Sequence, residues 1–322
     1  MDKAPELTII SVYHNDLTKR WIELKRDFVV RLNSFKNWVW FVGDNSLPEL
    51  EDKIDSKKFN VIPNGGPRFN KKSGVKYWQS YDHASALNFC LNKVETRFVL
   101  HLDNDFFVVR PEWIRDALAY MKTNDLAFFG APYYPRDYRK ERYFPTPAFC
   151  VFIDLEKIPL AALDYTPQFE SAGSRTTGKN RLNLFNLQIR KKNIGTSLDT
   201  GHKVFTRYYN DKNTRFECVQ PVYNPFTDSR LAGKPGLIIN QMFEYFLPDR
   251  LCYIPKKFDY YVKSGFRELG YFDARGEGWE EHMWQGKPFG FHARAMRSQK
   301  KGYYDDEKLI SSVRSALSKF TA

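Results

Sequence analysis

The sequence predicts an α/β protein built on a doubly wound, mostly parallel sheet. Over the first half of the chain, short apolar runs of strand length alternate with longer segments in which apolar residues recur at helical spacing. Glycine, proline, asparagine and aspartate, which end strands, follow most of the short runs. Strands that alternate with helices in this way are typical of parallel sheets with helices on both faces. The 322 residues suffice for one large domain or two smaller ones.

The elements are expected in the following order. Residues 7–13 are mostly apolar and predict a buried first strand. A helix is expected next, because Leu24, Phe28, Val29 and Leu32 share one helical face. The further expected elements are strands at residues 38–42, 59–62, 97–102, 126–130 and 149–153, helices at residues 77–91 and in a segment opened by Pro111, and a C-terminal helix at residues 305–320.

The composition changes in the middle of the chain. Between about residues 164 and 236 the sequence becomes polar and basic, and we expect an insertion or second lobe that packs against the sheet. The chain is therefore divided into two halves of one domain, residues 1–160 and residues 161–322.

The chain is basic, with a formal net charge of +12 and a pI of about 9.3. Such a charge attracts nucleic acid, anionic membrane surfaces or phosphorylated small molecules. No apolar run is long enough to span a membrane, and the start lacks the apolar stretch of a signal peptide. The four cysteines show no CxxC spacing. We therefore expect a cytoplasmic protein with reduced thiols.

The most informative motif is an Asp-Asn-Asp triplet, in which Asp103 and Asp105 follow the apolar run 97–102. On an extended backbone, residues two apart share a face, so both aspartates are expected to point to one place beyond the strand. Two close carboxylates repel unless a cation lies between them, and such oxygen ligands suit Mg²⁺ or Mn²⁺. His14 and Asp44 follow two other strands and are expected at the same edge of the sheet. The motif indicates an enzyme that uses a phosphorylated donor.

Several segments resemble the GT-A family of nucleotide-sugar glycosyltransferases, especially its family-2-like branch. The resemblance covers residues 7–155 well and includes the Asp-Asn-Asp triplet, which is similar to the DxD motif that holds the metal on the donor diphosphate. It implies that residues 1–160 bind the donor and residues 161–322 the acceptor. The similar segments are Val12-Tyr13-His14, Val42-Gly43-Asp44-Asn45-Ser46, residues 83–88, residues 98–105, residues 145–150 on the acceptor side, and Phe291-His292-Ala293-Arg294.

The resemblance also implies roles for single residues. Asp103 and Asp105 would hold Mn²⁺ or Mg²⁺, and a late histidine, His292, would complete the metal shell. Arg294 would bind phosphate oxygens, and Asp44 would accept hydrogen bonds from the base or ribose. The residues expected to contact the nucleotide sugar are Val12, Tyr13, His14, Asp44, His83, Asp103, Asn104 and Arg294.

The catalytic base is left between two places. An inverting enzyme needs a carboxylate near the acceptor hydroxyl to accept its proton, whereas a retaining enzyme of this fold has no such clear base. Asp199 lies in a polar turn and is slightly favoured. Glu280 and Glu281 are the second candidates, because they resemble the family's Glu-Asp motif, although the second acid is a glutamate and the spacing is short.

These features predict a metal-dependent glycosyltransferase of the hexosyltransferase type. The expected donor is a nucleotide sugar, with UDP the commonest nucleotide in the family, and the acceptor is a hydroxyl on a glycan, a lipid-linked sugar or a protein. A basic, aromatic surface suits peripheral contact with an anionic membrane. No recognised nucleic-acid motif is present, so nucleic acid is not an expected partner.

Two alternatives stay open. A sugar-phosphate nucleotidyltransferase would have the same broad sheet architecture, but residues 14–20 lack the glycine-rich loop that this class usually carries after the first strand. A non-enzymatic binder of an acidic polymer would explain the positive charge. Such a binder has no need of paired acids at a strand end.

Overall fold

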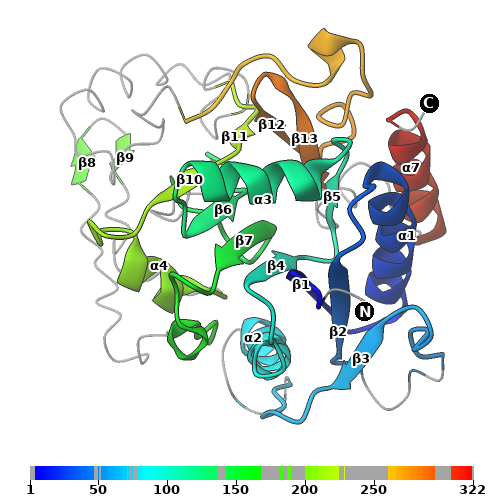
Figure 1. Cartoon of the computed structure of the whole chain (residues 1–322). Coiled ribbons are helices and arrows are strands. Elements are labelled where there is room, and N and C mark those ends of the chain that lie inside the picture. The colour runs from blue at the N-terminus through cyan, green and yellow to red at the C-terminus, as the bar shows by residue number, and fades with distance from the viewer. Residues whose placement is uncertain are drawn as a thin grey trace.

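The computed structural model describes residues 4–46, 50, 52–70, 72, 74, 78–135, 143–167, 182–184, 187–189, 200–224, 228, 260–293 and 306–320. At its centre lies a seven-stranded, mostly parallel sheet, which confirms the predicted α/β class (Figure 1). From edge to edge the strands are β10 (Phe216–Cys218), β6 (Phe128–Gly130), β7 (Cys150–Asp154), β4 (Phe98–Leu102), β1 (Leu7–Tyr13), β2 (Trp38–Asp44) and β3 (Asn60–Pro63).

The central strands are parallel except for β7. β1 pairs in parallel with β2 and β4, β2 with β3, and β6 with β10. β7 runs antiparallel to both of its neighbours, β4 and β6. Six of these strands lie within two residues of the predicted bounds, and the first has the predicted bounds, whereas β10 was not predicted.

Helices cover both faces of this sheet, and α2 lies across it from α3 (Figure 1). The helices are α1 (Asp16–Leu32), α2 (Trp78–Leu91), α3 (Trp113–Thr123), α4 (His202–Tyr208) and α7 (Asp306–Ser318), with 3₁₀ turns at Leu160–Ala162 and Arg267–Leu269. α1 begins with a capping box, because Asn15 and Thr18 bond each other's backbone N–H groups. α3 begins after the N-cap residue Glu112, so Pro111 precedes the helix and does not occupy its first turn as predicted.

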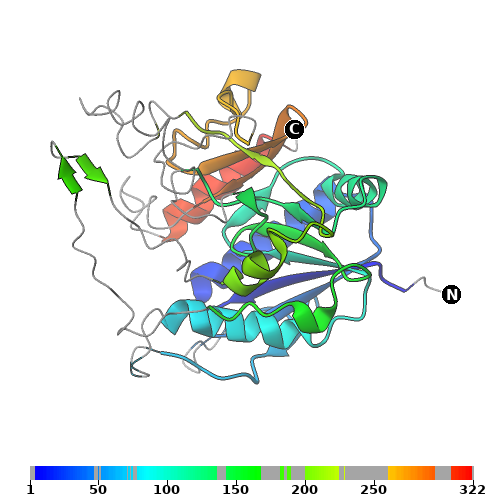
Figure 2. The same cartoon turned by 90° about the vertical axis from the view of Figure 1, so that its left-hand side faces the viewer.

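The apolar core follows the alternation of side chains along the strands. Leu7 and Ile9 of β1 pack in one cluster with residues of α1, α3 and α7. Ile10 and Val12 pack in a second cluster with residues of α2 and α4. The sheet is thus the middle layer of three, and α1 and α7 lie side by side on one face of it (Figure 2).

A second, antiparallel sheet lies next to the central one and was not predicted from the sequence. Its strands are β11 (Gln220–Pro221), β12 (Glu280–Trp284), β13 (Lys287–His292) and β5 (Phe106–Val108), in that order. β5 begins shortly after the end of β4, so the second sheet starts beside the triplet at 103–105. β13 pairs with β5 and thereby brings the late segment around residue 290 to the same place.

The polar and basic middle segment is described only in part. It contributes α4, β10, β11 and a two-stranded sheet of β8 (Leu182–Leu184) and β9 (Leu187–Ile189). β10 joins the central sheet at its edge, so this segment extends the sheet (Figure 1). None of the helices in the described part of the chain has the length and apolar composition needed to cross a membrane. Cys90 and Cys150 are free, buried thiols.

Candidate active site

The order of the central strands reverses between β1 and β4. From β1 the chain continues to β2 and β3 on one side, whereas β4 lies on the other side of β1. In open α/β sheets, ligands bind outside the carboxyl ends of the strands at such a switch point. β1 ends at Tyr13 and β4 at Leu102, directly before Asp103. The sheet therefore places the triplet where ligands of this fold class bind.

The triplet forms the connection between β4 and β5. The backbone N–H of Asp103 donates to the carbonyl of Phe149 at 2.8 Å, and the Asn104 N–H donates to Asp103 Oδ1 at 2.8 Å. Asn104 Nδ2 donates to the carbonyl of Val12 at 3.3 Å and ties the turn to β1. Residues 104 and 105 form a turn, so the predicted alternation along an extended strand is wrong as the reason why the two acids converge. The turn places them instead.

The two acids interact in a partly buried environment. Burial and the neighbouring charge of Asp105 raise the pKa of Asp103 to about 7, although His292 and Lys25 act against this rise. Burial and like charge both disfavour the ionised carboxylate, and a nearby cation restores it. The pair is therefore chemically suited to receive a positive charge.

Lys25 is a buried cation beside the triplet that the sequence reasoning missed. It lies on α1, is 2% exposed, and donates from Nζ to the backbone carbonyl of Asp103. Its ammonium group also lies 5.3 Å from the centre of the Phe107 ring. Burial lowers the pKa of Lys25 to about 8, against the opposing effect of Asp103 and Asp105. The signal was present, because Lys25 stands four residues after Trp21 on the apolar face of the helix.

His292 meets the triplet from the second sheet. Its Nε2 lies 2.9 Å from Asp105 Oδ1 and its Nδ1 lies 3.1 Å from Glu280 Oε2. Burial alone would lower the pKa of His292, but Asp105 and Glu280 together raise it to about 9. The structure thus brings together the predicted residues Asp103, Asp105 and His292, and adds Glu280 behind the histidine.

These side chains fit a divalent cation by their chemistry. Asp103 and Asp105 supply hard carboxylate oxygens, which Mg²⁺ and Mn²⁺ prefer, and His292 directs Nε2 toward the same place. A carboxylate behind the second ring nitrogen, as in the Glu280 contact, is the usual surrounding of a histidine ligand. Among the residues that the structure describes, no group of three or more acidic, histidine or cysteine side chains is arranged so that it could hold a metal ion without moving.

A hydrogen-bonded network lies at the ends of β1 and β2. The Asn45 amide donates to Asp82 Oδ2 at 2.6 Å and to His14 Nδ1 at 3.1 Å. His14 Nε2 lies 3.1 Å from His83 Nδ1, so Nε2 is the protonated nitrogen when Nδ1 accepts from Asn45. Burial, His83 and Arg68 lower the pKa of His14 to about 3. The predicted residues His14 and His83 therefore belong to one hydrogen-bonded cluster beside the switch point.

Asp44 and Tyr13 lie next to this hydrogen-bonded cluster. Asp44 accepts from the backbone N–H and the hydroxyl of Ser46, at 3.0 and 2.6 Å, and lies 3.6 Å from Lys53 Nζ. Burial and Asp44 raise the pKa of the Tyr13 hydroxyl. The side chain of Val12 is fully buried. Only its backbone could contact a ligand at the end of β1, and its carbonyl already accepts a hydrogen bond from Asn104.

The base candidates have different surroundings. Asp199 lies outside the described residues, as does Arg294. Glu280 is fully buried against His292. Glu281, the next residue on β12, accepts the backbone N–H groups of Phe266 at 2.9 Å and Arg275 at 3.1 Å. Burial raises the pKa of Glu281 to about 7 against these hydrogen bonds.

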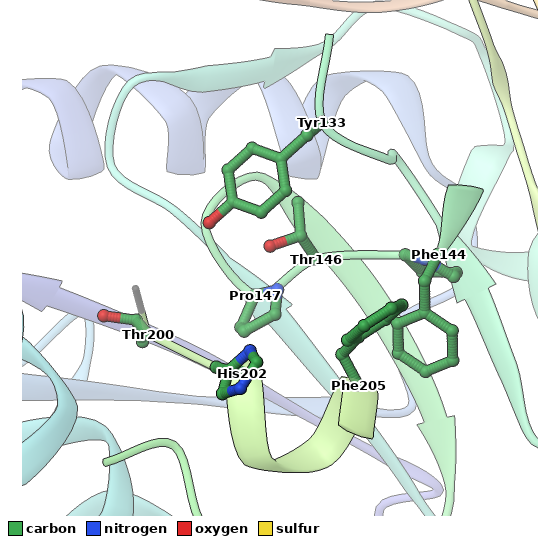
Figure 3. A pocket seen from close by; sticks show the side chains of 9 residues that line it. Tyr133, Phe144, Thr146, Pro147, Thr200, His202 and Phe205 are labelled. Carbon is green, nitrogen blue, oxygen red and sulfur yellow. The ribbon is translucent and has the colours of Figure 1, made fainter. Parts of the chain in front are cut away.

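A small pocket lies beside the segment expected on the acceptor side. Figure 3 shows Tyr133 and Thr146 on one side of it and His202 and Phe205 of α4 on the other. Its volume of about 10 Å³ leaves room for about one water molecule. Gly201 closes it at φ 89°, where a Cβ atom would lie 2.5 Å from Pro147. In this structure the pocket is thus too small for a sugar.

Comparisons with known proteins give only partial likenesses. No protein-family model matches the sequence, and no curated protein matches it. Among solved structures, residues 1–349 of TarS from S. aureus match with 16% identity and a TM-score of 0.35, over 52% of each chain. The mannosyltransferase PcManGT from Pyrobaculum calidifontis, solved with GDP-Man and Mn²⁺, matches with 16% identity and a TM-score of 0.33, over 49% of this chain and 46% of its own.

Mouse xyloside xylosyltransferase 1 also matches, with 14% identity and a TM-score of 0.31, over 48% of this chain and 68% of its own. The chain thus spans about half of the TarS fragment and of PcManGT. Likenesses of this extent assign neither a family nor an activity to the chain.

Proposed function

We propose that the chain is a metal-dependent glycosyltransferase that moves a hexose from a nucleotide sugar to a hydroxyl acceptor. The observation that carries the proposal is the meeting of Asp103, Asp105 and His292 at the switch point of the sheet. Glycosyl transfer from such a donor releases a nucleoside diphosphate with developing negative charge, and catalysis needs positive charge at that place. The sequence resemblance to GT-A glycosyltransferases supports the same reading.

Asp103, Asp105 and His292 would hold Mn²⁺ or Mg²⁺ in this proposal. The bound cation would act as a Lewis acid that neutralises charge on the departing diphosphate. The ammonium group of Lys25 donates a hydrogen bond to the backbone carbonyl of Asp103, and the Asn104 amide bonds the turn to β1. Both acids are therefore held in place before a ligand binds. This preorganisation lowers the cost of reaching the reactive arrangement.

The nucleotide would bind at the ends of β1 and β2. His14, His83 and Asp44 supply hydrogen-bonding groups there, and burial keeps His14 neutral, so it can donate or accept without adding charge. A UDP-sugar is the donor we propose. The side chain of Tyr13 is fully buried in the core, so it is not in a position to contact the base as predicted. Arg294 would reach the phosphates from the segment that follows His292.

The acceptor is proposed to be a glycan, a lipid-linked sugar or a protein hydroxyl, bound on the side of α4. Asp199 remains the first candidate for the base because of the polar turn in its sequence, and Glu280 and Glu281, which are both buried, remain the second candidates. We also propose a cytoplasmic location, and the net charge of +12 supports peripheral contact with an anionic membrane.

A donor screen tests the proposal. The purified protein is incubated with Mn²⁺ and each of several UDP- and GDP-sugars, and sugar hydrolysis and Tm are measured. We expect one donor to raise Tm and to be hydrolysed slowly, and Asp103→Ala to lose both effects. If no nucleotide sugar changes Tm or is hydrolysed, with or without metal, the proposal is wrong. Pyrophosphate release from a sugar phosphate and a nucleoside triphosphate would instead support a nucleotidyltransferase.

A further inference from the structure

Glu280 is the most buried acid beside the candidate metal site. It is the first residue of β12 and is 0% exposed. A carboxylate at such a position is costly unless it is bonded to a group that needs it. Its Oε2 lies 3.1 Å from Nδ1 of His292, which is itself only 6% exposed. The contact joins two buried groups that are twelve residues apart.

The second sheet sets this contact through strand register. Glu280 is paired with His292 across β12 and β13, and His292 is paired with Phe106 across β13 and β5. Asp105 directly precedes β5, and its carbonyl accepts the backbone N–H of Ala293 at 2.9 Å. The side chains of Glu280, His292 and Asp105 therefore form a continuous hydrogen-bonded chain. The ring of Phe149 packs against the ring of His292, with 4.4 Å between their centroids.

This hydrogen-bonded chain determines which ring nitrogen of His292 faces Asp105. A carboxylate oxygen accepts hydrogen bonds, so Nδ1 of His292 carries the hydrogen that Glu280 receives. Nε2 then lies on the side of Asp105, 2.9 Å from its Oδ1. It also carries a hydrogen there, and a cation that binds to Nε2 displaces that proton. If the ring turned over, the bond to Glu280 would be lost inside a region from which water is excluded.

We propose that Glu280 is a positioning residue that acts through His292 and sets the affinity of the site for a divalent cation. It does so by holding the ring with Nε2 directed at Asp105 and by making Nε2 a stronger electron-pair donor to a bound cation. This rests on the proposed function, because it assumes that the three groups hold a metal. It also gives Glu280 a role other than the catalytic base, since the residue is fully buried behind the histidine.

The neighbouring residue offers a matched control. Glu281 is also buried, at 1% exposure, but on a strand its side chain points to the other face of β12. Its two oxygens accept backbone N–H groups of Phe266 and Arg275. The same substitution at residues 280 and 281 therefore removes a buried carboxyl group in both cases but changes the histidine contact only at residue 280.

The experiment measures the Kd for Mn²⁺ from the electron paramagnetic resonance signal of free aqueous Mn²⁺, without nucleotide. Wild type, Glu280→Gln, Glu280→Met, Glu281→Gln and His292→Ala are compared, with urea unfolding to record their stability. We expect Glu280→Met to bind Mn²⁺ about 10 to 100-fold more weakly than wild type. Glu280→Gln keeps an acceptor oxygen and is expected to lie between the two. Glu281→Gln is expected to have the wild-type Kd even if it is less stable.

The outcomes separate the inference from the proposed function. If His292→Ala weakens Mn²⁺ binding while both Glu280 variants bind like wild type, Glu280 has no positioning role and only this inference fails. If His292→Ala has the wild-type Kd, His292 is not a ligand and the inference also fails. If the wild type shows no saturable Mn²⁺ binding, the metal-dependent function fails, and the inference fails with it.

Discussion

Glu281 gives the sharpest test of how this part of the molecule is built. Burial raises the pKa of its carboxyl from the usual 4.5 to about 7, although the N–H groups of Phe266 and Arg275 and the charge of Arg275 act in the other direction. Asp273, which faces the same hollow, adds to the rise. The perturbation is Glu281→Gln, which removes the titration and keeps the size of the side chain.

The magnitude follows from linkage between proton binding and folding. Between pH 4.5 and about 7 the folded protein binds the proton of Glu281 more tightly than the unfolded chain does, so the free energy of unfolding falls as the pH rises. Below pH 4.5 the bound proton stabilises the folded protein fully, and above about pH 7 this stabilisation is lost. At about 1.4 kcal/mol per pH unit, the loss is about 3 kcal/mol. Glu281→Gln lacks this loss and instead loses about one hydrogen bond at every pH.

The assay is urea unfolding of both proteins at a series of pH values between about pH 5 and about pH 8. We expect the stability of wild type relative to Glu281→Gln to fall by about 2 to 3 kcal/mol across this range. Because the other titrating groups are present in both proteins, their effects cancel in the difference. A difference that stays constant with pH, or that grows as the pH rises, would refute the reasoning.

Three further predictions concern the candidate site. Asp105→Ala should lower turnover at least about 1,000-fold while circular dichroism stays unchanged, because charge stabilisation worth several kcal/mol is lost; near-normal turnover would contradict this. Lys25→Met should tighten Mn²⁺ binding at least about tenfold in calorimetry, because the repulsion of a neighbouring cation that it removes outweighs the lost hydrogen bond to the Asp103 carbonyl; weaker binding would contradict it. Asp44→Ala should raise the donor KM about tenfold with an unchanged Kd for Mn²⁺, and an unchanged KM would show that Asp44 only shapes its turn.

The central sheet was predictable because its strands and helices are set by local patterns. Residues 7–13 and 98–102 are mostly apolar, and they form β1 and β4 as expected. The periodicity of Leu24, Phe28 and Val29 likewise predicted α1. These signals depend only on neighbours in the sequence, so a reading along the chain recovers them.

The second sheet was not predictable in the same way. β5 is only three residues long, and β12 and β13 lie about 180 residues further along the chain. Their pairing depends on long-range contacts, which local patterns do not encode. For this reason Glu280 and His292 were recognised as chemical groups, but the bond between them was not foreseen.

The site shows the same division. Asp103 and Asp105 were found from their position after an apolar run, whereas their turn geometry was not. Lys25 was passed over because the polar residues of a helix usually face solvent, and only the fold shows that this one points to the triplet. The hydrogen bond between Asn45 and Asp82 joins the residue that follows β2 to a residue of α2, and only the fold brings the two together.

The most direct measurement is anomalous diffraction from crystals grown with Mn²⁺ and a nucleoside diphosphate. The account predicts one strong manganese peak between the carboxylates of Asp103 and Asp105, with Nε2 of His292 at a coordination distance of about 2 Å and the diphosphate on its open side. Crystals that contain the nucleotide but leave both acids without metal, with the manganese peak elsewhere, would contradict it.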